Sequence, residues 1–143
     1  MIEITVNTTP IAQPRQRHSV ITRLGKTFVT NYTPKTHPVT QYKLELQRAC
    51  CNQYAGDPLE GPLEVKFRFV MPRPKGKFWK TKPMPRERHY GKPDVDNLLK
   101  STADALTGIL WTDDSQICAG EIEKWIAAGD EQPHVVVTVR ELQ

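Results

Sequence analysis

The sequence predicts an α+β fold in which two main helices pack on a mixed or antiparallel sheet, within one domain that spans residues 1–143. The first observation is that stretches with the two-residue period of strands and stretches with the period of amphipathic helices follow one another along the chain. The second is the order of these stretches: strand, hairpin, helix, strand, long loop, helix, strand, strand. The third is size, because 143 residues suffice for one sizeable core. The order of the strands in the sheet stays open.

The first half of the chain contains four of these elements. Alternating apolar residues predict a strand over 2–7. Residues 19–22 and 27–30 flank Arg23-Leu24-Gly25-Lys26 and predict a β-hairpin, in which Gly25 can take a positive φ. Apolar residues at three- and four-residue steps predict a helix over 38–54, with Pro38 in the first turn, where a helix tolerates proline. Residues 63–69 alternate strictly and predict a half-buried strand.

The second half begins with a loop and continues with a helix and two strands. From Val95 to Leu106 the apolar residues follow helical spacing, Asp94 stands at the N-cap position, and Gly108 is placed to end the helix. The stretches 116–126 and 134–140 read as strands.

Residues 71–91 form a long, basic, proline-rich loop. It has no periodicity, and Phe78, Trp79 and Tyr90 are interleaved with its charges. Cations pair with phosphates and aromatic rings stack on unpaired bases, so this loop predicts nucleic-acid contact, with a solvated linker as the alternative. With the basic residues near the hairpin, the predicted DNA-binding residues are Arg15, Arg17, Arg73, Lys75, Lys77, Lys80, Lys82, Arg86, Arg88 and Lys92.

Charge is distributed unevenly between the two halves. Residues 1–92 carry 17 Lys and Arg against 6 Asp and Glu, whereas residues 93–143 carry 3 against 10. A basic half beside an acidic cluster suits a polyanionic substrate that is brought to a metal centre, and it also suits two solvated faces. We see no membrane helix or signal peptide, and three cysteines without CxxC spacing predict free thiols, so a cytoplasmic protein is expected.

The acidic cluster is the most informative feature of the sequence. Asp94 and Asp96 lie two residues apart, and Asp104, Asp113 and Asp114 follow. Like charges this close repel each other, and a divalent cation removes the repulsion, which predicts a magnesium site able to assist phosphodiester hydrolysis. Lys100, one turn after Asp96, is placed to supply a positive charge.

Each aspartate also has an ordinary explanation. Asp94 can cap the helix, Asp96 can favour its positive end, Asp104 can pair with Lys100, and an aspartate in a turn is common.

The distance between the two ends of the cluster limits the site. A helix over 95–107 is about 20 Å long, and residues 108–114 span at most roughly 23 Å when extended. Asp114 therefore reaches Asp94 and Asp96 only if the chain runs straight back along the helix. Otherwise the second acidic group comes from another subunit of an intertwined dimer.

The motif that contains these acids resembles the signature of the RusA-type Holliday junction resolvases. The matching stretches are Lys92-Pro93-Asp94-Val95-Asp96-Asn97-Leu98-Leu99-Lys100, Asp104-Ala105-Leu106-Thr107-Gly108 and Trp111-Thr112-Asp113-Asp114-Ser115-Gln116-Ile117. They cover about 25 residues, and compatible length and element order extend a weaker resemblance over most of the chain. The loop at 71–91 departs from the pattern, since it is longer than the short basic linker of the family's best-known member.

The resemblance implies a homodimeric, bacterial or phage-encoded, magnesium-dependent endonuclease, with Mn²⁺ as a substitute, that cuts four-way DNA junctions symmetrically in recombination and repair. It implies that Asp94, Asp96 and Asp114 are the catalytic acids and metal ligands, that Lys100 is the catalytic lysine, and that Asp113 is a secondary metal ligand. Two other interpretations stay open: a non-catalytic nucleic-acid-binding protein, and a magnesium nuclease of broader branched-DNA specificity.

Overall fold

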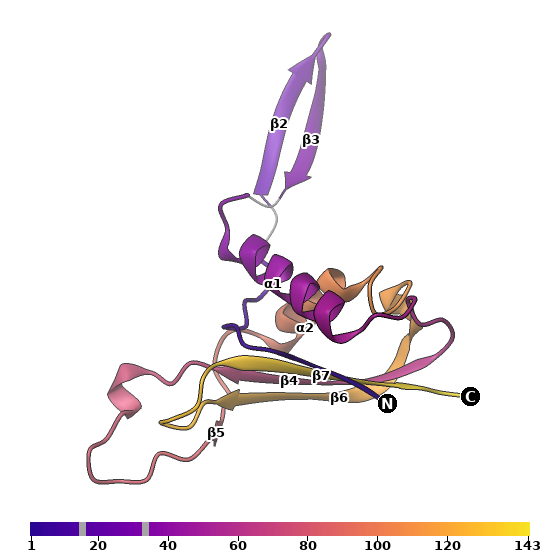
Figure 1. Cartoon of the computed structure of the whole chain (residues 1–143). Helices are drawn as coiled ribbons and strands as arrows, with labels where there is room; N and C mark the ends of the chain where they lie inside the picture. Colours follow the sequence, from indigo (N-terminus) through magenta and orange to yellow (C-terminus); the bar gives the residue numbers. More distant parts are fainter. Residues whose placement is uncertain (15–16, 33–34) are drawn as a thin grey trace.

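In the computed structural model, two helices lie on one face of a five-stranded sheet, and a two-stranded hairpin projects from the helical side (Figure 1). The structure describes residues 1–14, 17–32 and 35–143, and within the hairpin it describes the side chains of residues 20, 22–27 and 29. The strands are β1 (Ile2–Val6), β2 (Arg17–Arg23), β3 (Lys26–Tyr32), β4 (Leu63–Met71), β5 (Glu87–Arg88), β6 (Ile117–Ile126) and β7 (His134–Glu141). The helices are α1 (Pro38–Gln53) and α2 (Val95–Leu106), with short 3-10 turns η1 (Lys75–Lys77) and η2 (Asp114–Gln116).

The sheet has the order β1-β7-β4-β6-β5. The central strand β4 pairs parallel with β6 and antiparallel with β7, and the remaining pairs are antiparallel. The sheet is therefore mixed, and the predicted α+β class with two main helices is confirmed. The parallel pair fixes the direction of β6, which follows the acidic cluster in the sequence.

The alternation that predicted β4 separates the two faces of the sheet. Val65, Phe67 and Phe69 are buried and pack in one core with residues of both helices. The residues between them face the other side, where Arg68 pairs with Glu123 at 3.0 Å. One face is thus apolar and covered by helices, and the other is open and polar.

The two helices begin and end close to the predicted residues. The imidazole of His37 caps α1 by accepting from the amide of Val39 at 3.1 Å, and Pro38 occupies the first turn. The helices contact each other through a buried hydrogen bond of 2.7 Å between the hydroxyls of Tyr42 and Thr102. No helix in the described ranges is long and apolar enough to cross a membrane.

The loop predicted at 71–91 contains more structure than the sequence indicated. It includes η1 and strand β5, which adds to the edge of the sheet beside β6. The Arg73 side chain is almost fully buried, and its guanidinium donates to the carbonyls of Lys77, Pro85 and Ala127 and pairs with Glu87 at 3.0 Å. These bonds hold the loop against the end of the sheet.

Candidate active site

Two aspartates, Asp94 and Asp96, lie at the beginning of α2, where strand β6 of the sheet contacts the chain. Lys124 of β6 donates from Nζ to the carbonyls of Gly91 and Pro93, at 2.6 and 2.7 Å. The amide of His89 donates to the Lys124 carbonyl at 3.1 Å. These bonds fasten the residues that lead into Asp94, so the start of the helix has a defined position.

The carboxylates of Asp94 and Asp96 are exposed and unpaired. Asp94 occupies the N-cap position, but its side chain makes no capping hydrogen bond. Neither carboxylate forms a hydrogen bond or ion pair with another described residue. The simplest structural explanation for Asp94, that it caps the helix, therefore does not apply. Both carboxylates are therefore free to act as the hard oxygen ligands that Mg²⁺ prefers.

Lys100 lies one turn further along α2 and is also exposed. Its expected structural partner, Asp104, instead approaches Lys43 of α1 at 4.0 Å. Lys100 therefore has no ion-pair partner among the described residues. Since Asp96 and Lys100 are four residues apart on one helix, they lie on the same face.

Asp114 lies at the opposite end of α2. After Leu106 the chain makes a compact turn, in which the amides of Ile109 and Leu110 donate to the Leu106 carbonyl and the amide of Gly108 donates to the Trp111 carbonyl at 2.7 Å. The φ of Gly108 is +89°. This turn excludes the extended return path that would have brought Asp114 back to Asp94 within one chain.

The direction of β6 also indicates that Asp114 and the acidic pair lie at opposite ends of α2. Strand β6 begins just after Asp114, and Lys124, seven residues after its first residue, reaches the beginning of α2. The strand from Ile117 to Lys124 is about 23 Å long, and α2 is about 18 Å long. Along the described parts of the chain, no three His, Cys, Asp or Glu side chains gather in a group that could hold a metal ion.

The second acidic group has its own electrostatics. Asp113 accepts from the amide of Ser115 at 2.9 Å, which lowers its pKa and makes it a cap of η2. Desolvation raises the pKa of the exposed Asp114, and its hydrogen bond with Asp113 and the charges of Asp113 and Asp104 raise it further. A cation near Asp114 would relieve this repulsion.

The predicted DNA-binding residues differ in burial and in ion pairing. Arg73 is buried and bonds within the chain, so it anchors the loop, and its contact with DNA stays a prediction. Lys77 pairs with Glu87 at 3.3 Å, and Arg86 forms an ion pair with Glu131. The members that stay exposed without an ion pair to another described residue are Lys75, Lys80, Lys82, Arg88 and Lys92. Arg15 and the side chain of Arg17 lie outside the described residues.

The aromatic residues of the loop also differ from one another. The Trp79 ring lies under the guanidinium of Arg73, 5.0 Å from its centroid. Tyr90 is 98% exposed, although the residues on both sides of it are tied to Lys124. A ring fixed at its backbone and open on both faces, four residues before Asp94, is placed to stack on an unpaired base.

The sequence alone did not indicate Lys124 or Trp125. Lys124 fastens the site, and the Trp125 ring carries the Arg88 guanidinium 3.8 Å from its centroid. Both belong to a strand whose pattern reads as ordinary alternation, and only the pairing with β5 and the direction of β6 bring them to the loop.

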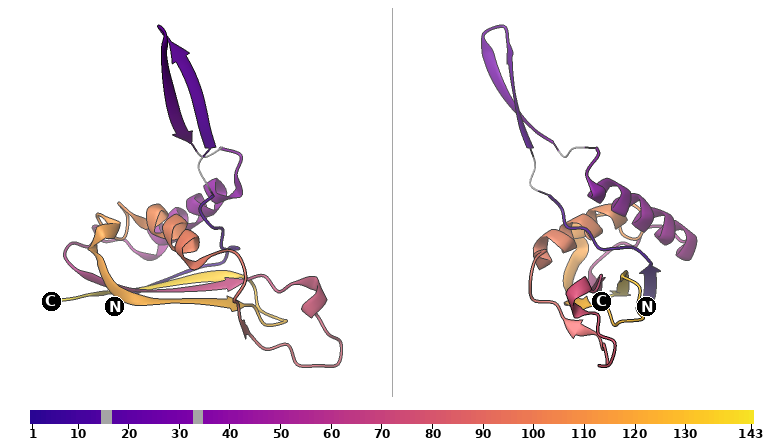
Figure 2. Two further views of the ribbon diagram at one scale, coloured as in Figure 1. Left: turned by 180° about the vertical axis from the view of Figure 1, so that it is seen from behind. Right: turned by 90° about the vertical axis from the view of Figure 1, so that its left-hand side faces the viewer.

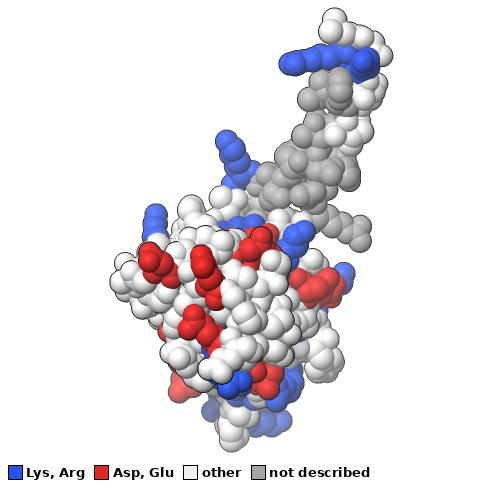
Figure 3. Space-filling view, turned by 90° about the vertical axis from the view of Figure 1, so that its right-hand side faces the viewer, with Lys and Arg blue, Asp and Glu red and all other residues white. Residues whose placement is uncertain are grey.

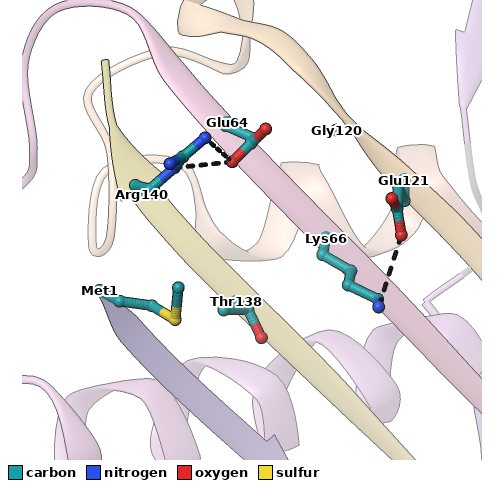
Figure 4. Close-up of a pocket in the computed structure, with 7 residues that line it drawn as sticks. All are labelled: Met1, Glu64, Lys66, Gly120, Glu121, Thr138 and Arg140. Atoms are coloured by element: carbon teal, nitrogen blue, oxygen red, sulfur yellow. Dashed lines mark hydrogen bonds and ion pairs between the residues drawn. The ribbon is translucent and has the colours of Figure 1, made fainter. Parts of the chain in front are cut away.

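A hollow on the open face of the sheet does not contain the acidic pair (Figure 4). Its charged side chains pair with each other, Glu64 with Arg140 at 2.7 Å and Lys66 with Glu121 at 3.4 Å. Because these charges are already neutralised, we assign this hollow to the stability of the sheet and not to chemistry.

The structure thus has exposed acids at a fixed helix start beside a basic loop, an arrangement that suits a polyanionic substrate. Comparison with known families identifies the class. Residues 7–140 match the family described as endodeoxyribonuclease RusA, so the chain belongs to this family of DNA-cleaving hydrolases. It is also 29% identical, over 147 residues, to an uncharacterized protein of Bacillus subtilis (strain 168) named YqaN; the match covers 99% of this chain and 96% of that protein.

Proposed function

We propose that this protein is a magnesium-dependent endonuclease that resolves four-way DNA junctions by paired, symmetric cuts, in DNA recombination and repair. The observation that carries the proposal is the unpaired Asp94 and Asp96 carboxylates, at a fastened helix start beside Lys100, in a member of the RusA endodeoxyribonuclease family. Because its relative comes from a bacterium, we expect this protein to be bacterial or encoded by a phage, and to work in the cytoplasm.

The complete site needs two subunits. The compact turn after α2 leaves Asp114 near the C-terminal end of the helix, whereas the acidic pair stands at its beginning, and the helix is about 18 Å long. We therefore propose a homodimer in which Asp94 and Asp96 of one subunit meet Asp114 of the other. A two-fold axis then generates two equivalent sites, which matches the two cuts that a symmetric junction requires.

Each residue has a role in this scheme. Asp94, Asp96 and the second subunit's Asp114 would hold Mg²⁺, for which Mn²⁺ would substitute, with Asp113 as an additional ligand. The ion would supply an activated water and stabilise charge on the phosphodiester. Lys100 presents a positive charge to the phosphate oxygens as negative charge develops on them. The exposed cations of the loop position the DNA by its phosphates.

The experiment is a cleavage assay on a synthetic four-way junction, with linear duplex, flap and fork substrates of matched length. We expect paired nicks at symmetric positions in the junction, only with Mg²⁺ or Mn²⁺. Asp96→Asn should bind the junction without cutting it. Equal cutting of linear duplex contradicts junction selectivity, and equal cutting of flaps and forks points to a broader branch nuclease. DNA affinity without product under any metal points to a non-catalytic binding protein.

A further inference from the structure

The turn of the β2–β3 hairpin carries a residue that is unfavourable for folding. Leu24 and Gly25 form a two-residue turn, and their φ angles are +50° and +77°. Such turns favour Asn-Gly, because a side chain with an ordinary Cβ crowds the backbone at positive φ. Leu24 is also fully exposed, so its apolar side chain gains nothing from burial in the chain itself. A residue that is unfavourable in both respects at an arm's tip points to a function outside the fold.

The hairpin has the charge of a DNA-binding element. Residues 17–32 include Arg17, Arg23 and Lys26 and contain no Asp or Glu. Arg23 and Lys26 are opposite each other in the last pair before the turn, so a cation flanks Leu24 on each strand. The space-filling view shows basic side chains at the far tip of the hairpin, away from the acidic side chains on the body (Figure 3).

The segment that leads toward the hairpin, residues 11–13, lies beside the candidate active site. Before β2, the amide of Gln13 donates to the carbonyl of Asn97 in α2 at 2.9 Å. The hydroxyl of Ser101, also in α2, donates to the carbonyl of Ile11 at 2.6 Å. The chain thus leaves the body along the half of α2 that carries Asp96 and Lys100, and the arm then extends away from the body (Figure 2). Each strand of the arm has seven residues and is about 20 Å long.

We propose that the β2–β3 hairpin is a DNA-binding arm that inserts Leu24 into the minor groove. Arg23 and Lys26 contact the phosphates on the two sides of the groove, and Leu24 wedges against or between base pairs and bends the duplex. β-Ribbons bind in the major or the minor groove of DNA, and minor-groove proteins combine cations with apolar side chains that wedge between base steps. Every charge on the arm is basic, and the exposed apolar side chains described on it, Leu24, Val20 and Val29, are too few for a stable protein interface. DNA therefore suits this arm better than a second copy of the chain.

The inference rests on the proposed function only in that the ligand is DNA, so the test measures binding in EDTA and needs no cleavage. The variants are Leu24→Asn, which suits the turn better than leucine, and Leu24→Met, which keeps an apolar wedge. A third variant, Arg23→Gln with Lys26→Gln, removes the flanking charges. Affinity is measured by fluorescence anisotropy over a salt series, and bending by energy transfer between the ends of a labelled 30-bp duplex.

We expect Leu24→Asn to weaken DNA binding by about tenfold and to abolish bending. The salt dependence of binding should not change, and the melting temperature of the protein should stay the same or rise. Leu24→Met should retain bending. The double variant should reduce the slope of log affinity against log salt by about 2.

Equal affinity and bending of Leu24→Asn and the unchanged protein would overturn the inference. Loss of the dimer in Leu24→Asn would also overturn it, since Leu24 would then belong to a contact between copies, together with the exposed Val20 and Val29 of the same arm. Loss of cleavage in the junction assay, with these binding results intact, would instead count against the proposed function alone.

Discussion

Replacing Lys124 by methionine removes the two hydrogen bonds that fasten the chain before Asp94. The bonds are short, 2.6 and 2.7 Å, and their donor is charged. Hydrogen bonds to charged groups contribute about 1.5–3 kcal/mol each, and partial solvent exposure at Gly91 reduces this. We expect Lys124→Met to lower the free energy of unfolding by about 1–2 kcal/mol, which is a few degrees in melting temperature.

The functional consequence separates positioning from stability. Without the two hydrogen bonds from Lys124, the backbone no longer holds Asp94 and Asp96 in one position. The magnesium concentration for half-maximal cleavage should therefore rise, and the cleavage rate should fall by about tenfold to a hundredfold. Junction affinity in EDTA should not change. The matched control is Lys66→Met, which removes ion pairs to Glu121 and Glu123 on the open face and touches no part of α2. If the two variants lose the same stability and show the same magnesium dependence, Lys124 has no positioning role.

Three other substitutions test separate parts of the structure. Tyr90→Ala should weaken junction binding in EDTA by about tenfold, whereas Tyr90→Phe should not; equal anisotropy titrations of the two would contradict stacking. In Gly120→Ala, the new Cβ would lie 1.8 Å from the Val65 carbonyl oxygen at a φ of +152°, so we expect about 3 kcal/mol or more of destabilisation in urea; an unchanged midpoint would refute this. Hydrogen bonds from Trp125 and Arg68 lower the pKa of Glu123 to about 2. This carboxylate therefore stabilises the fold at pH values above its ordinary pKa of 4.5, and the stabilisation is lost as the pH falls toward 2. Glu123→Gln should therefore lower stability by about 1 kcal/mol or less at pH 7 and by less at pH 2.5; an equal loss at both values would argue against the charge.

The sequence predicted the regular elements well because their signals are local. The period of residues 63–69, the proline at the start of α1 and the glycine after α2 each determine backbone geometry within a few residues. The acidic motif likewise placed Asp94 and Asp96 at a helix start. The length of the helix left two arrangements, in which Asp114 reaches the acidic pair either along an extended return segment of its own chain or from another subunit. The compact turn at 106–111 excludes the first.

What the sequence did not reveal depends on contacts between distant segments. Arg73 counts as one basic residue among many until the sheet end surrounds it with carbonyl oxygens and Glu87. Lys124 is an ordinary strand lysine until β6 runs parallel to β4 and meets the chain before α2. Exposure separates Leu24 and Tyr90 from other apolar residues, and exposure is a property of the folded chain.

The shared active site can be tested by mixing two inactive variants. In a heterodimer of Asp96→Asn and Asp114→Asn subunits, one site combines both substitutions and the other combines Asp96 of one subunit with Asp114 of the other, both unchanged. If the acids meet across the dimer, tagged heterodimers should nick one strand of a four-way junction with Mg²⁺, at about half the rate of the unchanged dimer. If each site is built within one chain, every site in the heterodimer carries a substitution and no cleavage will be seen, which would contradict the account.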